Sequence, residues 1–486
     1  MLEFLLDELK EGEKLTTNGA KVLATTGDSR LDFFAELGSM RRLSREEIIQ
    51  RFNVVFKEYP LDALKLLMYC RDRNMVGERN TARVILRYLA NNHSDIYIKN
   101  MSLIAHFGRW DDLILTGIGT NSEEAMIGLI KEQLELDLKT KYPSLLGKWM
   151  PSINTSSDTT RKVAIRLSKR LGMNCGEYRK LLSKLRNKIN IVETYMSSNK
   201  WSEIEYSKLT SKNNLLYANA FSRHDSERYD KYIEEVISGK AKINTSKLFP
   251  YEIVRKCIND TRQREVMNTL WDKLPNYLPE NLGDTLVVCD TSGSMTCSMR
   301  GIKPIDVALA LTLYFGERNT GIFNNYFMTF SKNPQLVKIQ GRDLYEKIIN
   351  ISRADWGMNT NLEGVYELLL NTSIKNNLKQ EDMVKRIVII SDMNIDACTY
   401  GSGRKLRFMD EMRRRFNEAG YEMPKCVFWN VESSNTSFLA SKDDEDMSLM
   451  SGASASLFKA ITKGNTPMEM LREMVLENEI YSNVRI

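Results

Sequence analysis

Three oxygen-bearing side chains alternate in a short loop in the C-terminal half of the chain. Asp290, Ser292 and Ser294 follow the apolar run 286–289, and Gly293 lets the backbone turn sharply between the serines. A tightly curled loop would aim all three side chains at one point. Carboxylate and hydroxyl oxygens are the ligands that a hard divalent cation such as Mg²⁺ accepts. The stretch therefore predicts a metal loop; the alternative is a Ser-rich loop that caps a helix N-terminus.

Two further polar side chains are placed to join this loop. Asp392 follows the apolar run 388–390, and Thr360 lies in a loop that precedes a helical pattern. In an open α/β sheet, ligands bind at the carboxyl ends of the strands, near the point where the strand order reverses. We therefore expect three loops to bring two carboxylates and three hydroxyls to one edge of a sheet.

The elements that must position these side chains alternate between strand and helix beyond residue 284. Near-continuous apolar runs separated by helical patterns predict an α/β, Rossmann-like, doubly wound parallel sheet. The expected strands are 285–289, 325–330, 335–339, 386–390 and 425–430. The expected helices are 305–317, 344–351, 362–370, 405–419 and 467–476.

The first 280 residues have a different pattern, with helical periodicity that starts near residue 31. Ser44 and Glu47 form a capping box for a helix that runs towards Tyr59, and Pro60 begins the next helix. Short helices joined by short turns predict an α-solenoid or an array of α-hairpins. Residues 1–30 are expected to form an arm packed on the body. We predict a helical domain at 1–280 and a second domain at 281–486; the sequence leaves open whether the helices close into a ring.

Composition narrows the functional class. The chain has 486 residues, of which 42% are hydrophobic and 27% charged, as is usual for soluble globular proteins. Its seven cysteines are scattered, which indicates reduced thiols, and its three histidines disfavour a His-rich metal centre or a His-based hydrolase. No apolar run is long enough to cross a membrane. We expect a cytoplasmic protein of bacterial or phage origin.

A strongly basic segment lies in the helical part. Residues 161–190 hold ten Lys or Arg residues and one acid, Glu177. Two consecutive helices of this composition predict a surface for a polyanion, while the alternative is a solvated helix face. Tyr178, Tyr195 and Trp201 are candidates for stacking on bases or for the core. The candidate nucleic-acid-binding residues are Arg161, Lys162, Arg166, Lys169, Arg170, Arg179, Lys180, Lys184, Arg186 and Lys188.

The pattern of Asp290, Ser292 and Ser294, with Thr360 and Asp392 downstream, resembles the metal-ion-dependent adhesion site of von Willebrand factor A domains. The resemblance implies that the first three residues coordinate a divalent cation, Mg²⁺ or another such as Mn²⁺ or Ca²⁺. It implies that Thr360 coordinates the ion directly or through water, and Asp392 often through water. The sixth position would take an acidic residue from a protein partner, so the site would be adhesive and not catalytic.

The whole chain also resembles the DUF2828 family, which couples a helical region to such a domain. The residues that carry this resemblance are 77–79, 106–112, 178–180, 192–196, 248–250, 391–393 and 427–430. More distantly, the chain is similar to the Ro autoantigen type of protein, in which a ring of HEAT-like helices, the TROVE module, is closed by an A domain. That resemblance implies binding of small structured or single-stranded RNA.

Two functional hypotheses follow, and a third is disfavoured. The first is a non-catalytic Ro-like RNA-binding scaffold with a metal site in its A domain. The second is a metal-dependent protein-adhesion or assembly module whose basic face is merely solvated. An enzyme is disfavoured, because no phosphate-binding Gly loop or suitably placed general base is apparent. Asp111 and Asp112 are interpreted as helix caps, and Glu78 and Arg79 as partners in an internal contact.

Overall fold

The protein is described from a computed structural model. The residues that it describes are 13–15, 21–280, 282–296, 302–330, 334–354, 361–394, 408–432 and 438–486. Within these ranges, no helix is both long and apolar enough to cross a membrane.

The first 280 residues are rich in helix, as expected. A short antiparallel pair, β1 (Glu13–Leu15) and β2 (Lys21–Leu23), comes first. The helices nearest the N-terminus are α2 (Ser29–Glu36), α3 (Arg45–Glu58), α4 (Pro60–Arg71), α5 (Asn80–Asn92), α6 (Ser94–Lys99), α7 (Met101–Phe107) and α8 (Trp110–Gly117). The next are α9 (Glu123–Lys139), α10 (Leu146–Trp149), α11 (Asp158–Arg170), α12 (Cys175–Ile189) and α13 (Val192–Ser197). The last are α14 (Ser211–His224), α15 (Ser226–Ile237), α16 (Pro250–Asn259) and α17 (Arg264–Asp272).

The helix start predicted at Ser44 is confirmed. The Ser44 hydroxyl accepts a hydrogen bond from the Glu47 backbone N–H, and the Glu47 carboxylate accepts one from the Ser44 backbone N–H. This reciprocal pair satisfies two backbone donors that the first turn of α3 leaves free. Pro60 begins α4, where its missing N–H costs no helical hydrogen bond.

The C-terminal part contains a six-stranded sheet. Its strands are β3 (Thr285–Cys289), β4 (Tyr326–Thr329), β5 (Leu336–Lys338), β6 (Arg386–Ser391), β7 (Lys425–Asn430) and β8 (Met447–Ser451). Its helices are α18 (Pro304–Arg318), α19 (Leu344–Ser352), α20 (Leu362–Lys375), α21 (Phe408–Glu418) and α22 (Pro467–Leu471), which continues into a π-helical turn at Arg472–Leu476. β3 and β7 have the predicted bounds. Of the helix predicted at 405–419, residues 405–407 lie outside the described part of the chain.

The prediction of a wholly parallel sheet is wrong in one respect. The strand order is β5-β4-β3-β6-β7-β8, and all neighbours are parallel except β4 and β5, which are antiparallel. A short connection from residue 330 to residue 335 joins these two strands. Because parallel neighbours need a long crossover, so short a link allows only a hairpin. The sheet is therefore mixed.

The central strands are buried on both faces, which is why they are continuously apolar. Every residue of β3 is buried, and α18 is buried over most of its circumference. α18 is enclosed because it lies between the sheet and α16 of the helical part. A helix that is apolar around most of its surface requires partners on two sides.

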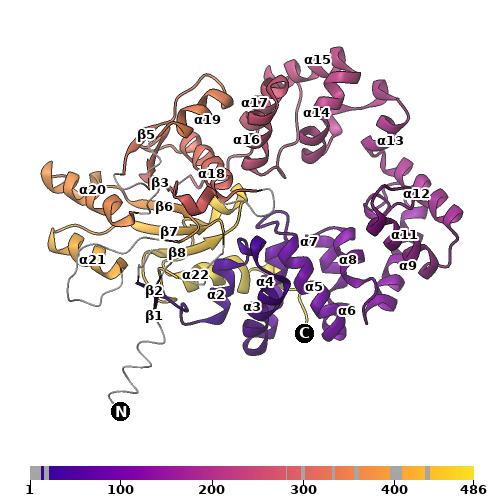
Figure 1. The fold of residues 1–486 in the computed structure, drawn as a ribbon, viewed down its shortest axis with the longest axis horizontal. Helices are drawn as coiled ribbons and strands as arrows, with labels where there is room; N and C mark the ends of the chain where they lie inside the picture. The colour runs from indigo at the N-terminus through magenta and orange to yellow at the C-terminus, as the bar shows by residue number, and fades with distance from the viewer. Residues whose placement is uncertain are drawn as a thin grey trace.

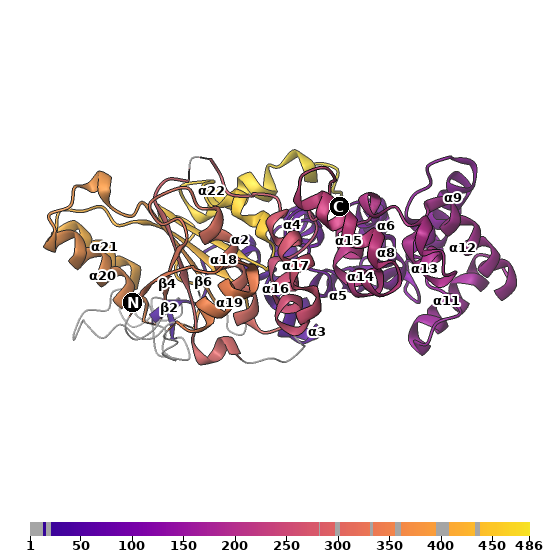
Figure 2. The same ribbon diagram turned by 90° about the horizontal axis from the view of Figure 1, so that it is seen from above.

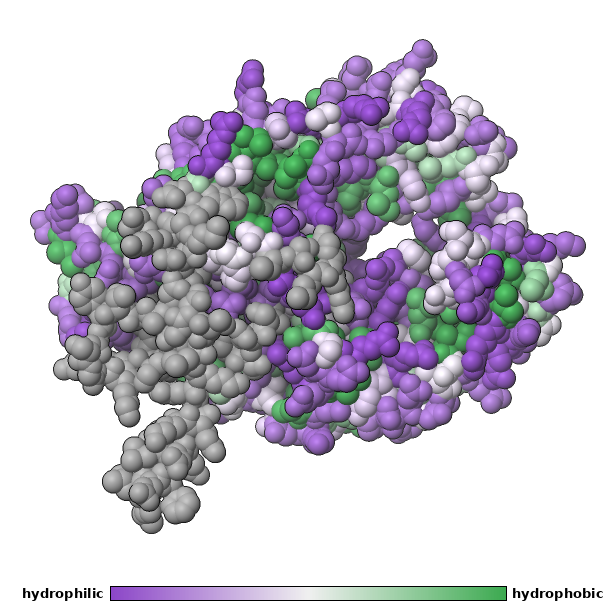
Figure 3. All heavy atoms as spheres, viewed as in Figure 1, coloured by the Kyte–Doolittle hydropathy of each residue, from purple (hydrophilic) through white to green (hydrophobic). Residues whose placement is uncertain are grey.

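The helices α3 to α17, which we call the helical arc, curve away from the sheet and return to it (Figure 1). Seen from above, the arc and the sheet lie side by side along the long axis of the molecule (Figure 2). The space-filling view shows an opening through the middle, bordered mostly by hydrophilic residues (Figure 3). The helical arc and the sheet together therefore form a closed ring.

The two ends of the helical arc also touch each other. Lys247, before α16, donates a hydrogen bond from Nζ to Oδ1 of Asn74, in the loop between α4 and α5. A Cβ atom placed on Gly77, in that same loop, would lie 3.2 Å from Cζ of Phe249. Ser456, from the sheet part, donates from Oγ to the Met75 carbonyl oxygen at 3.0 Å. These contacts close the ring at one loop.

Candidate metal centre and basic helices

The two aspartates of the predicted metal site lie on neighbouring strands. Cys289, the last residue of β3, is in register with Ile390 of β6, and the Asp290 N–H donates to the Ile390 carbonyl oxygen at 3.0 Å. Asp290 and Asp392 therefore lie at the same edge of the sheet, each just beyond the end of one of two neighbouring strands. Since β3 and β6 are parallel, both loops start at their carboxyl ends, where open α/β sheets bind ligands.

Hydrogen bonds fix the loop after β3. Asp290 Oδ1 accepts from the Ser292 N–H at 2.8 Å, and the Ser292 and Ser294 hydroxyl oxygens lie 3.0 Å apart. A 3₁₀ turn over Gly293–Thr296 follows. The structure thus brings the three residues of the predicted metal loop together.

Residues of β6 and its loop hold the carboxylates in place. Ser391 Oγ donates to Asp290 Oδ2 at 2.5 Å and accepts from the Met393 N–H at 2.9 Å. Asp392 Oδ1 accepts from the Asn394 N–H at 3.1 Å. Ser391 is a positioning residue that the sequence reasoning missed; its place between an apolar strand and Asp392 was the available signal.

The electrostatics of the pair favour a cation. Burial, together with the negative charge of Asp392, raises the pKa of Asp290 to about 7. Neither carboxylate forms an ion pair with Lys, Arg or His in the part of the chain that the structure describes. A divalent cation would remove both the desolvation cost and the repulsion.

The donor set fits a hard divalent ion. The carboxylates of Asp290 and Asp392 and the hydroxyls of Ser292 and Ser294 follow two neighbouring strands at one edge of the sheet. The Thr291 hydroxyl is buried with no hydrogen-bond partner. Within the described ranges, no three His, Cys, Asp or Glu side chains cluster in a way that could hold a metal, so the hydroxyls are essential to the proposed site. Thr360, predicted as a further ligand, lies outside the described residues.

A third carboxylate lies at the same edge, and the sequence reasoning missed it. Glu432 follows β7, and its N–H donates to Asn430 Oδ1 at 2.9 Å. Burial raises the pKa of Glu432 to about 7 against the opposing charges of Arg42 and Arg41, and the charge of Asp392 adds to the rise. We call Asp290, Asp392 and Glu432 the carboxylate rim.

The basic segment forms two antiparallel helices, α11 and α12, at the end of the ring far from the sheet (Figures 1 and 2). Gly172, with φ of +78°, makes the turn between them. Ala164, Leu167, Tyr178 and Leu182 are buried on their inner faces. Eight of the ten predicted basic side chains are exposed: Arg161, Lys162, Arg166, Lys169, Arg170, Arg179, Lys180 and Lys184.

Acids outside the basic segment neutralise part of this charge. Asp158 pairs with Arg161 at 2.5 Å and with Lys162 at 2.7 Å. Glu123 of α9 pairs with Arg166 at 2.5 Å and lies 3.8 Å from Arg170.

The four remaining exposed cations pair with no acid among the described residues: Lys169, Arg179, Lys180 and Lys184. They are the cations of the segment that remain available to phosphates.

The other two predicted side chains point into the protein. Arg186 donates to the carbonyl oxygens of Gly147 at 3.0 Å and Met150 at 2.8 Å. Lys188 Nζ donates to three carbonyl oxygens at the end of α9. Both side chains tie α12 to its neighbours.

The aromatic candidates differ in exposure. Tyr178 is fully buried and donates to the Pro151 carbonyl oxygen at 2.8 Å, so it is a core residue. Trp201 is half-buried and stacks on His224, with ring centroids 4.4 Å apart. Tyr195 is half-buried as well.

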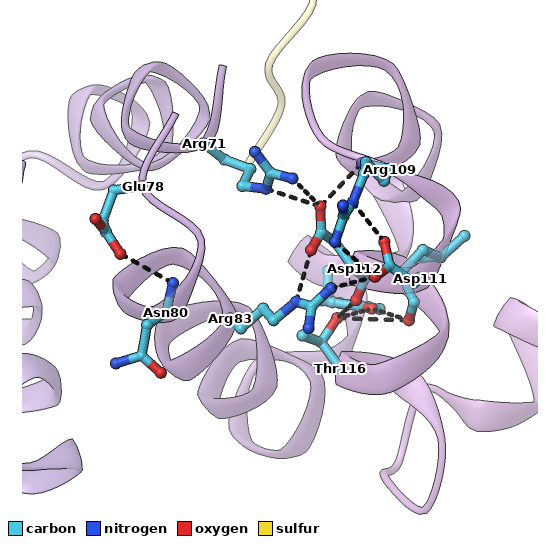
Figure 4. Close-up of polar contacts among 10 residues, drawn as sticks. Arg71, Glu78, Asn80, Arg83, Arg109, Asp111, Asp112 and Thr116 are labelled. Atoms are coloured by element: carbon cyan, nitrogen blue, oxygen red, sulfur yellow. Dashed lines mark hydrogen bonds and ion pairs between the residues drawn. The ribbon is translucent and has the colours of Figure 1, made fainter. Parts of the chain in front are cut away.

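The residues around the start of α8 form a buried ion-pair cluster (Figure 4). Asp112 caps the helix by accepting from the Arg109 N–H at 2.9 Å, as the cap interpretation expects. It also pairs with Arg71 at 2.6 Å and Arg83 at 2.6 Å. Although burial alone would raise it, the two guanidinium groups hold the pKa of Asp112 below its usual range. The cluster joins α4, α5 and α8.

Glu78 forms an ion pair with Arg41 at 2.9 Å, whereas Arg79, for which an internal contact was also predicted, is exposed. The contact joins the α4–α5 loop to the 3₁₀ turn Met40–Arg42.

The protein is thus a helical arc that a mixed α/β sheet closes into a ring. Carboxylates lie at the carboxyl ends of the strands of this sheet. Two family models match the chain: one described as domain of unknown function DUF2828, over residues 128–278, and one described as domain of unknown function DUF7788, over residues 284–483. The uncharacterized protein L728 of Acanthamoeba polyphaga mimivirus is 30% identical to this chain, in an alignment that is 515 residues long with its gaps and covers 97% of this chain and 88% of that protein. The chain belongs to the DUF2828 family.

Proposed function

We propose that this protein is a non-catalytic RNA-binding scaffold whose sheet domain carries a divalent-cation site. The observation that carries the proposal is the set of exposed cations on α11 and α12, of which Lys169, Arg179, Lys180 and Lys184 have no acidic partner among the described residues. Phosphates supply most of the affinity of such surfaces, and they position RNA without reading its sequence. The closed ring and the distant resemblance to Ro-type proteins support the same function.

The cation site would be of the adhesion type found in von Willebrand factor A domains. Asp290, Ser292, Ser294 and Asp392 would hold the ion, with Thr360 as the further ligand. Mg²⁺, Mn²⁺ or Ca²⁺ would supply positive charge with a position open to an acidic group of a partner. We assign this site a binding role because its residues would coordinate the ion from one side, and an acidic group of the partner would complete the coordination.

Fluorescence anisotropy tests the RNA-binding function. A labelled RNA hairpin with a single-stranded tail should bind the wild-type protein at about 50 mM salt, and binding should weaken steeply by about 200 mM. Charge reversal of Lys180 and Lys184 should weaken binding, whereas Lys231→Glu, an exposed lysine on α15, should leave it nearly unchanged. Absence of binding by the wild-type protein at low salt would refute the proposal.

A second function, metal-dependent protein adhesion, is favoured by one specific observation. The buried pair of Asp290 and Asp392 has no basic partner in the described part of the chain, so it is well suited to hold a cation that in turn binds a partner carboxylate. A pull-down would test it. A partner that is lost with EDTA and with Asp290→Ala, but is unaffected by ribonuclease, would support adhesion; a partner lost only with ribonuclease would contradict it.

A further inference from the structure

One aromatic side chain near the basic helices is left in solvent by a firmly held loop. Tyr142, between α9 and α10, is 81% exposed, more than any other large apolar or aromatic side chain that the structure describes. An aromatic ring in water contributes almost no burial free energy to folding. Leu136 near the end of α9 and Leu145 just before α10 are also exposed, at 60% and 44%.

The loop that presents Tyr142 is held from its inner side by Asp137. The Asp137 side chain is buried, and its Oδ1 atom accepts from the Ser144 N–H and from Gln133 Nε2, both at 2.8 Å. Its Oδ2 atom accepts from the Ser144 hydroxyl at 2.7 Å. Two of these three hydrogen bonds come from Ser144, so the buried carboxylate at the end of α9 is tied to the loop just beyond Tyr142.

The basic helix α12 holds the same loop. Lys188 Nζ donates to the carbonyl oxygens of Asp137, Leu138 and Thr140 at 3.0, 2.9 and 2.6 Å. Lys184 lies one turn earlier on α12, on the same face as Lys188, and is exposed. The Tyr142 loop is therefore fixed beside the cations proposed to bind phosphates.

The charge around Tyr142 is suited to a polyanion. Lys141 Nζ lies 5.5 Å from the centre of the Tyr142 ring. Residues 138–157 contain Lys139, Lys141 and Lys148 and no Asp or Glu. The nearest acid before this stretch, Asp137, is buried and satisfied by its hydrogen bonds.

We propose that Tyr142 stacks on an unpaired base of RNA bound along α12. This inference rests on the proposed RNA-binding function and adds a preference for single strands. Every base has a flat face that stacks on an aromatic ring, whereas the bases of a duplex are already stacked on each other. In this proposal Lys141, beside the Tyr142 ring, and Lys184, on α12, contact phosphates of the same strand.

Anisotropy with two RNA probes tests the inference. The probes are a labelled oligouridine of twelve nucleotides and a labelled blunt-ended duplex. Tyr142→Ala should weaken oligouridine binding about tenfold or more and leave duplex binding unchanged. Tyr142→Phe, which keeps the ring, should retain wild-type affinity. Leu216→Ala is the matched control, because this apolar side chain of α14 is 62% exposed.

The outcomes separate this inference from the function on which it rests. If the wild-type protein binds neither probe, the RNA-binding function falls, and the inference with it. If the wild-type protein binds both probes and Tyr142→Ala binds oligouridine as tightly, only the inference is overturned. Equal weakening of the binding of both probes by Tyr142→Ala would also overturn it. An unchanged oligouridine affinity of Tyr142→Ala, together with the loss of a protein partner from pull-downs, would overturn it as well.

Discussion

The Nε atom of Arg42 lies 3.4 Å from the Oε2 atom of Glu432, so the start of the helical part reaches the carboxylate rim of the sheet. Arg41, next to Arg42, pairs with Glu78 in the loop that closes the ring. A change in the charge of Glu432 therefore also acts on Arg42, at the start of the helical part.

Glu432 should make stability depend on pH. Its folded-state pKa is raised from near 4.5 to about 7, so the folded protein binds this proton more tightly than the unfolded chain does. The stability that Glu432 contributes is complete below about pH 4.5 and is lost as the pH rises through about 7. Relative to wild type, Glu432→Gln should gain about 2 kcal/mol between pH 5 and pH 8, measured by urea unfolding. A constant difference between the two proteins at both pH values would contradict the burial of this charge.

Divalent cations should stabilise the wild-type protein through Asp290. At a concentration about a hundred times the dissociation constant, one bound ion raises the free energy of unfolding by about 2.7 kcal/mol. Asp290→Asn and Ser292→Ala should remove the response to Mg²⁺ or Mn²⁺ in a thermal melt. Asp446→Asn is a suitable control, because Asp446 lies at the opposite end of the sheet and pairs with Lys425. A shift that persists in Asp290→Asn would place the ion elsewhere.

Loss of Asp112 should destabilise the helical arc. Asp112→Ala leaves the buried Arg71 guanidinium without its partner, and removing one member of a buried pair costs about 3–5 kcal/mol. Asp111→Ala should cost less, because the Asp111 carboxylate is more exposed than that of Asp112. Thermal unfolding followed by circular dichroism measures both. Equal effects of the two substitutions would argue against a special role of the buried pair.

A methyl group at Gly38 should weaken the contact between the helical part and the sheet. An added Cβ would lie 2.3 Å from the backbone oxygen of Ser451, at the end of β8, and a backbone atom cannot move aside cheaply. Gly38→Ala should therefore destabilise the protein by about 1–3 kcal/mol or more. Gly128→Ala, in open space within α9, should instead stabilise it by about 0.5–1 kcal/mol. The same sign for both substitutions would refute the close contact.

Local signals explain what the sequence predicted well. The apolar run of β3 and the capping box at Ser44 depend on residues within a few positions, and both are present as predicted. Asp290 and Asp392 were predicted to meet because each follows such a run, and the register of β3 with β6 brings them together. Neighbouring parallel strands make this kind of prediction possible.

Contacts between distant residues explain what the sequence did not show. β8 was not predicted, and it is buried in part by α2. Gly38, two residues after the end of α2, donates its N–H to Ser451 Oγ at 2.9 Å. Glu432 depends on Arg42, which lies far away in the sequence. Fewer cations of residues 161–190 are unpaired than the composition of that segment indicates, because Glu123, which pairs with Arg166, precedes the segment.

The salt dependence of RNA binding is the most direct test of the proposed function. For single-stranded RNA, the slope of log K against log salt concentration is about −0.7 for each phosphate contact. The wild-type protein should give a steep negative slope, and the double variant Lys180→Glu, Lys184→Glu should give weaker binding and a slope shallower by about 1.4. An absence of binding at about 50 mM salt, or equal slopes for the two proteins, would contradict the assignment of RNA to these helices.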